Sequence, residues 1–262
     1  MPFANSPYPH GTPCWVDLVV PDQRAALDFY RDVFGWECET GTQESGGYAI
    51  CTLKGKPVAG IATAISPDGG PAHRSVWTTY FAVSDVDASE KTIIESGGTV
   101  VGPGTDVRTL GRVVTATDPT GAAFGLWQAR DFSGAGIVNE PGAFIWNELN
   151  TSDPDAASRF YSRVLGVTRT PMEGEPGYSA IQVDERTVAG MQGLDKLPEG
   201  TPSHWLTYFA VDGTDRVAEA VVRAGGAVRK PPFDMSTGRM AVVRDPQGGT
   251  FAVITPSRGE AG

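Results

Sequence analysis

The sequence predicts an α+β protein built from two tandem domains of the same architecture. Residues 77–83 return as residues 205–211, with six of seven positions identical at an offset of 128. The Asp-Pro-x-Gly turn at 118–121 returns at 245–248. A repeat this long, whose spacing drifts by only a few residues, indicates that each half is a whole domain. The length of 262 residues agrees, because two domains of about 120 residues can each bury a core.

The first half alternates between β and α patterns. A short apolar strand is expected at 15–20, where Pro21 stops it. Asp22 then caps a helix with an apolar face, and Gly35 ends that helix. The half reads approximately as βαββ followed by βαβββ. Its other predicted elements are strands at 48–53, 58–64 and 78–83, a helix from Asp85 to about Ser96, and a strand on each side of the turn at 118–121.

The second half repeats this order of elements. It begins with a strand at 144–149, a helix at 153–164, and strands at 178–183 and 187–192, before a final strand, helix and two strands. Gly, Ser, Asn and Pro between the halves indicate a linker. We therefore predict an N-terminal domain over 1–128, a linker over 129–142, a C-terminal domain over 143–256, and a tail over 257–262.

Composition excludes several classes of partner. The formal charge of −10 argues against nucleic acids and anionic membrane surfaces, which require clustered Lys and Arg. Residues 1–11 lack a basic region and an apolar run, and no stretch approaches the ~18 apolar residues of a membrane helix, so we expect no signal peptide or anchor. The three cysteines, Cys14, Cys38 and Cys51, cannot all pair and form no C-x-x-C motif, so we expect a reducing compartment and a cytoplasmic protein that needs no disulfide.

Two βαβββ-like modules in each half, with Asp-Pro-x-Gly before the final strand, resemble the vicinal oxygen chelate superfamily of glyoxalase I, bleomycin-resistance proteins and extradiol dioxygenases. The resemblance covers nearly the whole chain. It implies two glyoxalase-like domains, each with paired modules that curl into an open cleft. In that family a divalent metal is usually held in the cleft by His, Gln or Glu.

The family's metal-ligand positions fall on poor ligands in this chain. They are Trp15, Thr78 and Gly125 in the first half, and Trp146, Leu206 and Ala252 in the second. Divalent metals need imidazole or carboxylate donors, typically at least three from the protein. The chain has only His10, His73 and His204. We therefore expect no bound metal, and no other cofactor is indicated.

A carboxylate shares each of these first strands with the indole. Strand side chains alternate in direction, so Asp17 faces the same side as Trp15, and Glu148 the same side as Trp146. A carboxylate within an apolar strand is costly unless it is paired or used. One interpretation is a structural hydrogen bond to backbone or to a tyrosine hydroxyl. In the other, burial raises the pKa and makes the carboxyl a general acid or base.

His204 lacks a counterpart, since Val76 stands at the equivalent position. If it faces Glu148, the two side chains could transfer protons. That would make the second cleft the better catalytic candidate.

Aromatic side chains are the candidate ligand contacts. Trp15 and Trp146 are either core residues or stacking walls opposite small residues. Strand parity adds Tyr80, Tyr208, Trp127, Thr78 and Leu206 to the same faces. Arg112 and Arg239 follow Gly at strand starts, where a structural salt link is favoured over anion binding.

Three hypotheses of function follow. The first is a metal-independent glyoxalase-like protein that binds a small, partly aromatic molecule, as bleomycin-resistance-type proteins do. The second is a metal-independent enzyme in which Glu148 or Asp17 transfers a proton, in an isomerase, lyase, glyoxalase-like or aromatic tailoring reaction such as hydroxylation. The third is a pseudoenzyme or interaction protein whose clefts are filled by side chains. A monomer and a homodimer both stay open.

Overall fold

The computed structural model describes residues 7–42, 46–63 and 75–257, which form two eight-stranded sheets. The first sheet contains β1 (Pro13–Val20), β2 (Glu37–Thr40), β3 (Ala49–Leu53), β4 (Lys56–Thr63), β5 (Val76–Ala82), β6 (Thr99–Val107), β7 (Gly111–Thr117) and β8 (Ala123–Ala129). The second contains β9 (Phe144–Thr151), β10 (Thr168–Pro171), β11 (Tyr178–Val183), β12 (Arg186–Gly193), β13 (His204–Ala210), β14 (Ala227–Met235), β15 (Gly238–Arg244) and β16 (Thr250–Pro256).

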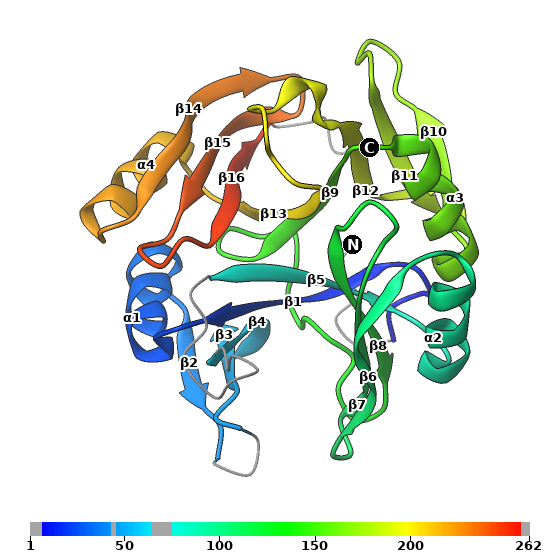
Figure 1. Cartoon of the computed structure of the whole chain (residues 1–262). Helices are drawn as coiled ribbons and strands as arrows, with labels where there is room; N and C mark the ends of the chain where they lie inside the picture. The colour runs from blue at the N-terminus through cyan, green and yellow to red at the C-terminus, as the bar shows by residue number, and fades with distance from the viewer. Residues whose placement is uncertain (1–6, 43–45, 64–74, 258–262) are drawn as a thin grey trace.

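The two sheets have the same strand order, β2-β3-β4-β1-β5-β8-β7-β6 and β10-β11-β12-β9-β13-β16-β15-β14 (Figure 1). In the first, β1 runs parallel to β4 and antiparallel to β5. β9 pairs with β12 and β13 in the same way. The predicted α+β class and its duplicated architecture are therefore confirmed.

The four strands that sequence reading missed, β2, β6, β10 and β14, are the edge strands of the two sheets. Edge strands face solvent and carry polar residues, so they lack a strong apolar alternation. In β2, Glu37, Glu39 and Thr40 are all exposed. Each module is thus a complete βαβββ unit.

Each half contains two helices, and capping fixes the ends of the first one. α1 (Gln23–Phe34) begins where the Asp22 carboxylate accepts a hydrogen bond from the Ala25 amide at 3.0 Å, and it ends at Gly35 with φ 73°. That backbone conformation favours glycine. α3 (Pro154–Leu165) has an equivalent N-cap and C-cap. The other helices are α2 (Val86–Glu95), α4 (Thr214–Arg223) and the short 3-10 turn η2 (Leu194–Lys196).

The halves pack through their helices, with α1 beside α4 and α2 beside α3 (Figure 1). Tyr30 of α1 donates a hydrogen bond to Asp245 in the turn of the second half at 3.0 Å, and Trp77 donates to the Tyr30 hydroxyl at 3.1 Å. In the reverse direction Tyr161 of α3 interacts with Asp118 in the turn of the first half, and Trp205 donates to the Tyr161 hydroxyl at 2.8 Å. Aromatic rings of both halves surround these groups, so the two cores are shared.

The segment between the sheets is folded against both of them. The Tyr8 hydroxyl donates to the Ala135 carbonyl at 2.7 Å, and the Trp36 indole donates to the Gly142 carbonyl at 2.7 Å. Ala135 and Ile137 are buried. The predicted linker is therefore a packed connection in this structure.

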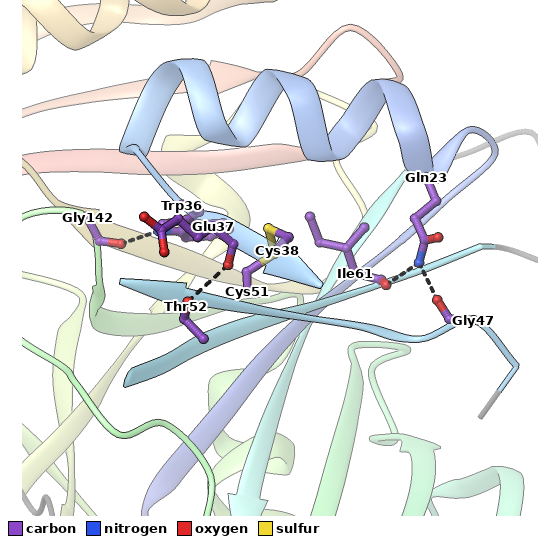
Figure 2. Close-up of a disulfide and its surroundings, with 9 residues drawn as sticks. All are labelled: Gln23, Trp36, Glu37, Cys38, Gly47, Cys51, Thr52, Ile61 and Gly142. Atoms are coloured by element: carbon purple, nitrogen blue, oxygen red, sulfur yellow. Dashed lines mark hydrogen bonds between the residues drawn. A yellow bond between two sulfur atoms is a disulfide. The ribbon is translucent and has the colours of Figure 1, made fainter. Parts of the chain in front are cut away.

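A disulfide joins Cys38 of β2 to Cys51 of β3, with Cα atoms 4.0 Å apart (Figure 2). The two residues are direct partners in the antiparallel ladder. The sequence reading, which expected a fold that needs no disulfide, did not predict this bond, because the pairing depends on the register of an edge strand that was not predicted. Disulfides are rare in reducing compartments, so this bond counts against the reducing, cytoplasmic location, which stays a prediction. No helix among the described residues is long and apolar enough to cross a membrane.

Candidate functional site

The first sheet encloses a cleft of about 1210 Å³. Its wall includes five aromatic side chains. The residues that matter most for the site are Trp15, Asp17, Tyr48, Tyr80, Trp127 and Phe132.

A hydrogen-bonded network centred on Asp17 lies at the floor of this cleft. The Trp15 indole donates to the Tyr48 hydroxyl at 2.8 Å. The hydroxyls of Tyr48 and Tyr80 both donate to Oδ2 of Asp17, at 3.2 and 3.0 Å. The other oxygen, Oδ1, is buried and has no hydrogen-bond partner among the described residues. Asp17 itself is only 5% exposed, so this oxygen is an unused acceptor beside a cleft.

Burial dominates the electrostatics of the network. It raises the pKa of Asp17 to about 7, against the opposing effect of the hydrogen bonds from Tyr80 and Tyr48. Burial also raises the pKa of both tyrosines, which therefore stay protonated and donate. Near neutral pH, the Asp17 carboxyl can either accept or release a proton.

Two glycines admit these tyrosines. A Cβ at Gly60 would overlap the Tyr48 hydroxyl, and a Cβ at Gly125 would overlap the Tyr80 ring. The space beside Gly125 was expected to be open to a ligand. It is filled by Tyr80 instead, because Tyr80 and Gly125 are direct partners in the β5–β8 pair.

The second half repeats the network with a longer acid. Trp146 donates to the Tyr178 hydroxyl at 3.1 Å, as Trp15 does to Tyr48. Burial raises the pKa of Glu148, while hydrogen bonds from Tyr178, Asn150, Tyr208 and Gln192 oppose the rise.

Two of these donors have no equivalent in the first half. Asn150 and Gln192 donate amide hydrogens to Oε1 of Glu148 at 3.2 and 3.1 Å. Val19 and Ala62 occupy the corresponding positions of β1 and β4. The second carboxylate is therefore held by amides as well as hydroxyls.

The remaining predicted site residues lie near the acids without bonding to them. Thr78 is the direct strand partner of Asp17, and Leu206 is the partner of Glu148. His204 pairs with Asn150, and its Nδ1 lies 2.8 Å from the Pro202 carbonyl oxygen. No contact between His204 and Glu148 is found among the described residues.

Sequence reading missed Tyr48 and Tyr178. Both follow a glycine and recur at an offset of 130, which was a usable signal. Tyr178 begins β11 and Tyr48 directly precedes β3, and each of these strands lies two places from the acid's strand in the sheet. The alternation of side chains along the acid's own strand therefore could not identify either tyrosine.

The two arginines singled out in the sequence form salt links, as predicted. Arg112 contacts Asp87 at 2.8 Å and Asp106 at 3.1 Å. Arg239 contacts Asp215 and Asp234. These pairs tie a helix to a hairpin in each half.

The residues present do not fit the metal site that the fold resemblance implies. Trp15, Thr78 and Gly125 offer no imidazole or carboxylate at the expected positions. In residues 7–42, 46–63 and 75–257, no group of three or more His, Cys, Asp or Glu is arranged to hold a metal ion. His73 lies outside these ranges.

Comparisons with known proteins agree with the duplicated fold. A family model described as "Glyoxalase/Bleomycin resistance protein/Dioxygenase superfamily" matches residues 13–126 and 143–253. Among solved structures, the Mn(II)-bound glyoxalase from Novosphingobium aromaticivorans aligns with a TM-score of 0.65 at 16% identity, covering 94% of this chain and 82% of that one. The 2,3-dioxygenase LapB from Pseudomonas sp. KL28 aligns with a TM-score of 0.62 at 17% identity, covering 94% and 92%.

More similar sequences also span both halves. "Putative glyoxylase CFP32" of Mycobacterium tuberculosis is 44% identical over 259 residues, which cover 97% of this chain and 98% of that protein. "Anthracycline biosynthesis protein DnrV" of Streptomyces peucetius is 36% identical over 259 residues, covering 93% of each.

Proposed function

We propose, from the premise that the chain belongs to the glyoxalase/bleomycin resistance protein/dioxygenase superfamily, that its first cleft binds a small, partly aromatic organic molecule without a metal. The observation that carries this proposal is the Asp17 network at the floor of an aromatic cleft of about 1210 Å³. That volume lies somewhat above the roughly 300–1,000 Å³ of typical ligand pockets, so the cleft has room for a small organic molecule.

The chemistry of the walls supports an aromatic ligand. The rings of Trp15 and Phe132 meet edge to face with centroids 5.0 Å apart, and Phe132 meets Trp127 at 6.1 Å. Ring contacts add roughly 0.5–1.5 kcal/mol beyond the burial of apolar area. The name of the relative DnrV refers to anthracycline biosynthesis, and anthracyclines are polycyclic aromatic compounds, which favours the same ligand class.

Binding can be tested with a cleft-filling variant. We expect 9-(hydroxymethyl)anthracene to quench tryptophan fluorescence, and Thr52→Trp, at a position that lines the cleft, to weaken its binding at least tenfold. The matched control is Gln182→Trp, because Gln182 pairs with Thr168 as Thr52 pairs with Glu37. Equal affinity in the wild type and Thr52→Trp would refute the proposal.

A second candidate function is proton transfer to the bound molecule by Asp17. It is favoured by the pKa of about 7, which places both protonation states within reach at neutral pH. The Tyr80 and Tyr48 hydroxyls would hold Oδ2, and the unpaired Oδ1 would exchange the proton with the ligand.

Catalysis and sequestration differ in what happens to the ligand. Metabolites that co-purify with the protein can be returned to it in D2O and analysed by mass spectrometry. Proton transfer predicts deuterium uptake or turnover that Asp17→Asn abolishes. Recovery of unchanged, undeuterated compounds from a binding-competent wild type would leave sequestration as the function.

A further inference from the structure

We propose that the first cleft selects aromatic molecules that carry a positive charge, with Glu37 and Glu39 of β2 forming its anionic rim. This inference rests on the proposed function, because it specifies the ligand class of the same cleft. It adds a part of the site, the edge strand β2, that neither the sequence nor the family relationship assigned.

The register of β2 places both glutamates on the cleft side. Glu37 pairs with Thr52, and Glu39 pairs with Ile50. Both partners line the cleft. Directly opposed residues in an antiparallel pair project from the same face, so the glutamates share that face.

The disulfide holds the strand in this register. Cys38 lies between the two glutamates and therefore projects from the opposite face, where it bonds to the buried Cys51 beneath α1 (Figure 2). The Thr52 hydroxyl also donates to the Glu37 carbonyl at 3.1 Å. A one-residue slip, which would turn the glutamates away from the cleft, would require the disulfide to break.

The charges of the lining are mostly negative. Neither Glu37 nor Glu39 forms an ion pair with another described residue. Asp106 also lines the cleft, but Arg112 and Arg130 bind it at 3.1 and 2.9 Å.

Glu37 and Glu39 are therefore the carboxylates of the described lining that have no arginine partner and an ordinary exposed setting, and the lining also contains the guanidinium of Arg108. Apolar walls around charges of one sign strengthen the local field, and the chain's net charge of −10 has the same sign. The cleft is therefore attractive to cations.

An independent feature at the floor of the cleft also favours a ligand that donates a hydrogen bond. The buried Oδ1 of Asp17 has no partner among the described residues, and a buried acceptor is stabilised when a ligand N–H or O–H reaches it. The aromatic faces of Trp15 and Trp127 add an attraction of their own, since indole rings bind organic cations.

The second half shows that the anionic rim is not required by the fold. Thr168 pairs with Gln182 as Glu37 pairs with Thr52, and Thr170 follows two residues later, where Glu39 stands in β2. The two glutamates thus distinguish the first cleft from the second. This natural difference supplies the test variant.

The test compares three ligands with the same ring system and different charge: 9-(aminomethyl)anthracene, 9-(hydroxymethyl)anthracene and 9-anthracenecarboxylate. We expect the ammonium to bind the full-length protein at least tenfold more tightly than the alcohol at low ionic strength, and the carboxylate to bind most weakly. The advantage of the ammonium should shrink as salt rises, because the rim is exposed and screened.

Glu37→Thr combined with Glu39→Thr should reduce the ammonium's advantage over the alcohol to about threefold or less. The control combines Glu95→Gln with Glu199→Gln, two exposed positions outside the lining, and changes the net charge equally. That control should keep the full preference.

The outcomes separate this inference from the proposed function. Equal binding of ammonium and alcohol to the wild type, or a preference independent of salt, would overturn the anionic rim and leave aromatic binding intact. Failure of all three ligands to bind would overturn both. If the threonine variant does not fold, as judged by circular dichroism, the salt dependence of the wild type and the Glu37→Gln and Glu39→Gln variants decide.

Discussion

The floors of the two clefts have the same design but hold their acids differently. In each half an indole donates to a tyrosine, and two tyrosines surround a carboxyl group from the first strand. Glu148 also receives two amide hydrogens, from Asn150 and Gln192. Asp17 has hydroxyl partners only, on one oxygen.

The two acids are equally buried and differ in how fully they are hydrogen-bonded. Each hydrogen bond to Glu148 stabilises its charged form and reduces its need for a further partner. Asp17 keeps one unsatisfied oxygen beside a cleft. The sequence favours the second cleft for catalysis if His204 faces Glu148, and no contact between these two side chains is found among the described residues.

The largest expected effect concerns the pH dependence of stability. Asp17 titrates near 3.8 when unfolded and near 7 when folded, so the folded state holds the proton between these values. Stability should therefore fall as pH rises from about 4 to about 7, by roughly 4 kcal/mol at most, and stay constant above that range.

Urea unfolding of wild type and Asp17→Asn from pH 4 to pH 8 measures this contribution by difference, because the variant lacks the titrating group. Glu148→Gln should change the pH profile in the same direction but less, since four donors oppose the rise of its pKa. A larger change in the pH dependence of stability in Glu148→Gln than in Asp17→Asn would contradict this expectation.

The next largest effect concerns the Cys38–Cys51 disulfide, which only the first half has. The double substitution Cys38→Ser and Cys51→Ser removes the cross-link between two residues that are 13 positions apart. This loss should lower the free energy of unfolding by about 3 kcal/mol. Dithiothreitol should reproduce the loss in the wild type and have no effect on the double variant. A wild type insensitive to dithiothreitol would show that the disulfide does not stabilise the fold.

Gly60→Ala and Gly190→Ala disturb the two networks in the same way. A Cβ at either position would overlap the hydroxyl of Tyr48 or Tyr178. Each variant should lose about 1–3 kcal/mol, but only Gly60→Ala should weaken binding of 9-(hydroxymethyl)anthracene. Gly213→Ala is the control, because a Cβ there meets nothing closer than 3.8 Å.

The smallest effect concerns the amides of the second half. Gln192→Ala removes one donor to Glu148 and should cost about 1 kcal/mol at pH 8, with a smaller loss at pH 5, where a carboxyl of raised pKa is more protonated. The control is Gln182→Ala, whose exposed bond to Thr170 should contribute little. Equal losses in both variants would mean that Gln192 does not support the charge of Glu148.

Much of the fold could be predicted because the repeat and the buried strands are encoded by local patterns. Trp15 with Asp17, and Trp146 with Glu148, also follow from strand parity. The edge strands could not be predicted, since exposed residues such as Glu37 and Glu39 leave no apolar period.

The partners of the acids depend on register between strands, which a single sequence does not specify. Tyr48 reaches Asp17 from just before β3, two strands away, and Gly60 of the intervening strand β4 makes room for it. The disulfide was missed for the same reason, because Cys38 and Cys51 become neighbours only once β2 is paired with β3.

Tyr30 of the first half reaches Asp245 of the second, and Tyr161 of the second half lies near Asp118 of the first. Each half therefore covers the other as the subunits of a dimer would. If the chain were cut after residue 142, each fragment would expose to water the aromatic surface that the other half covers. We therefore expect that neither half folds as an autonomous module.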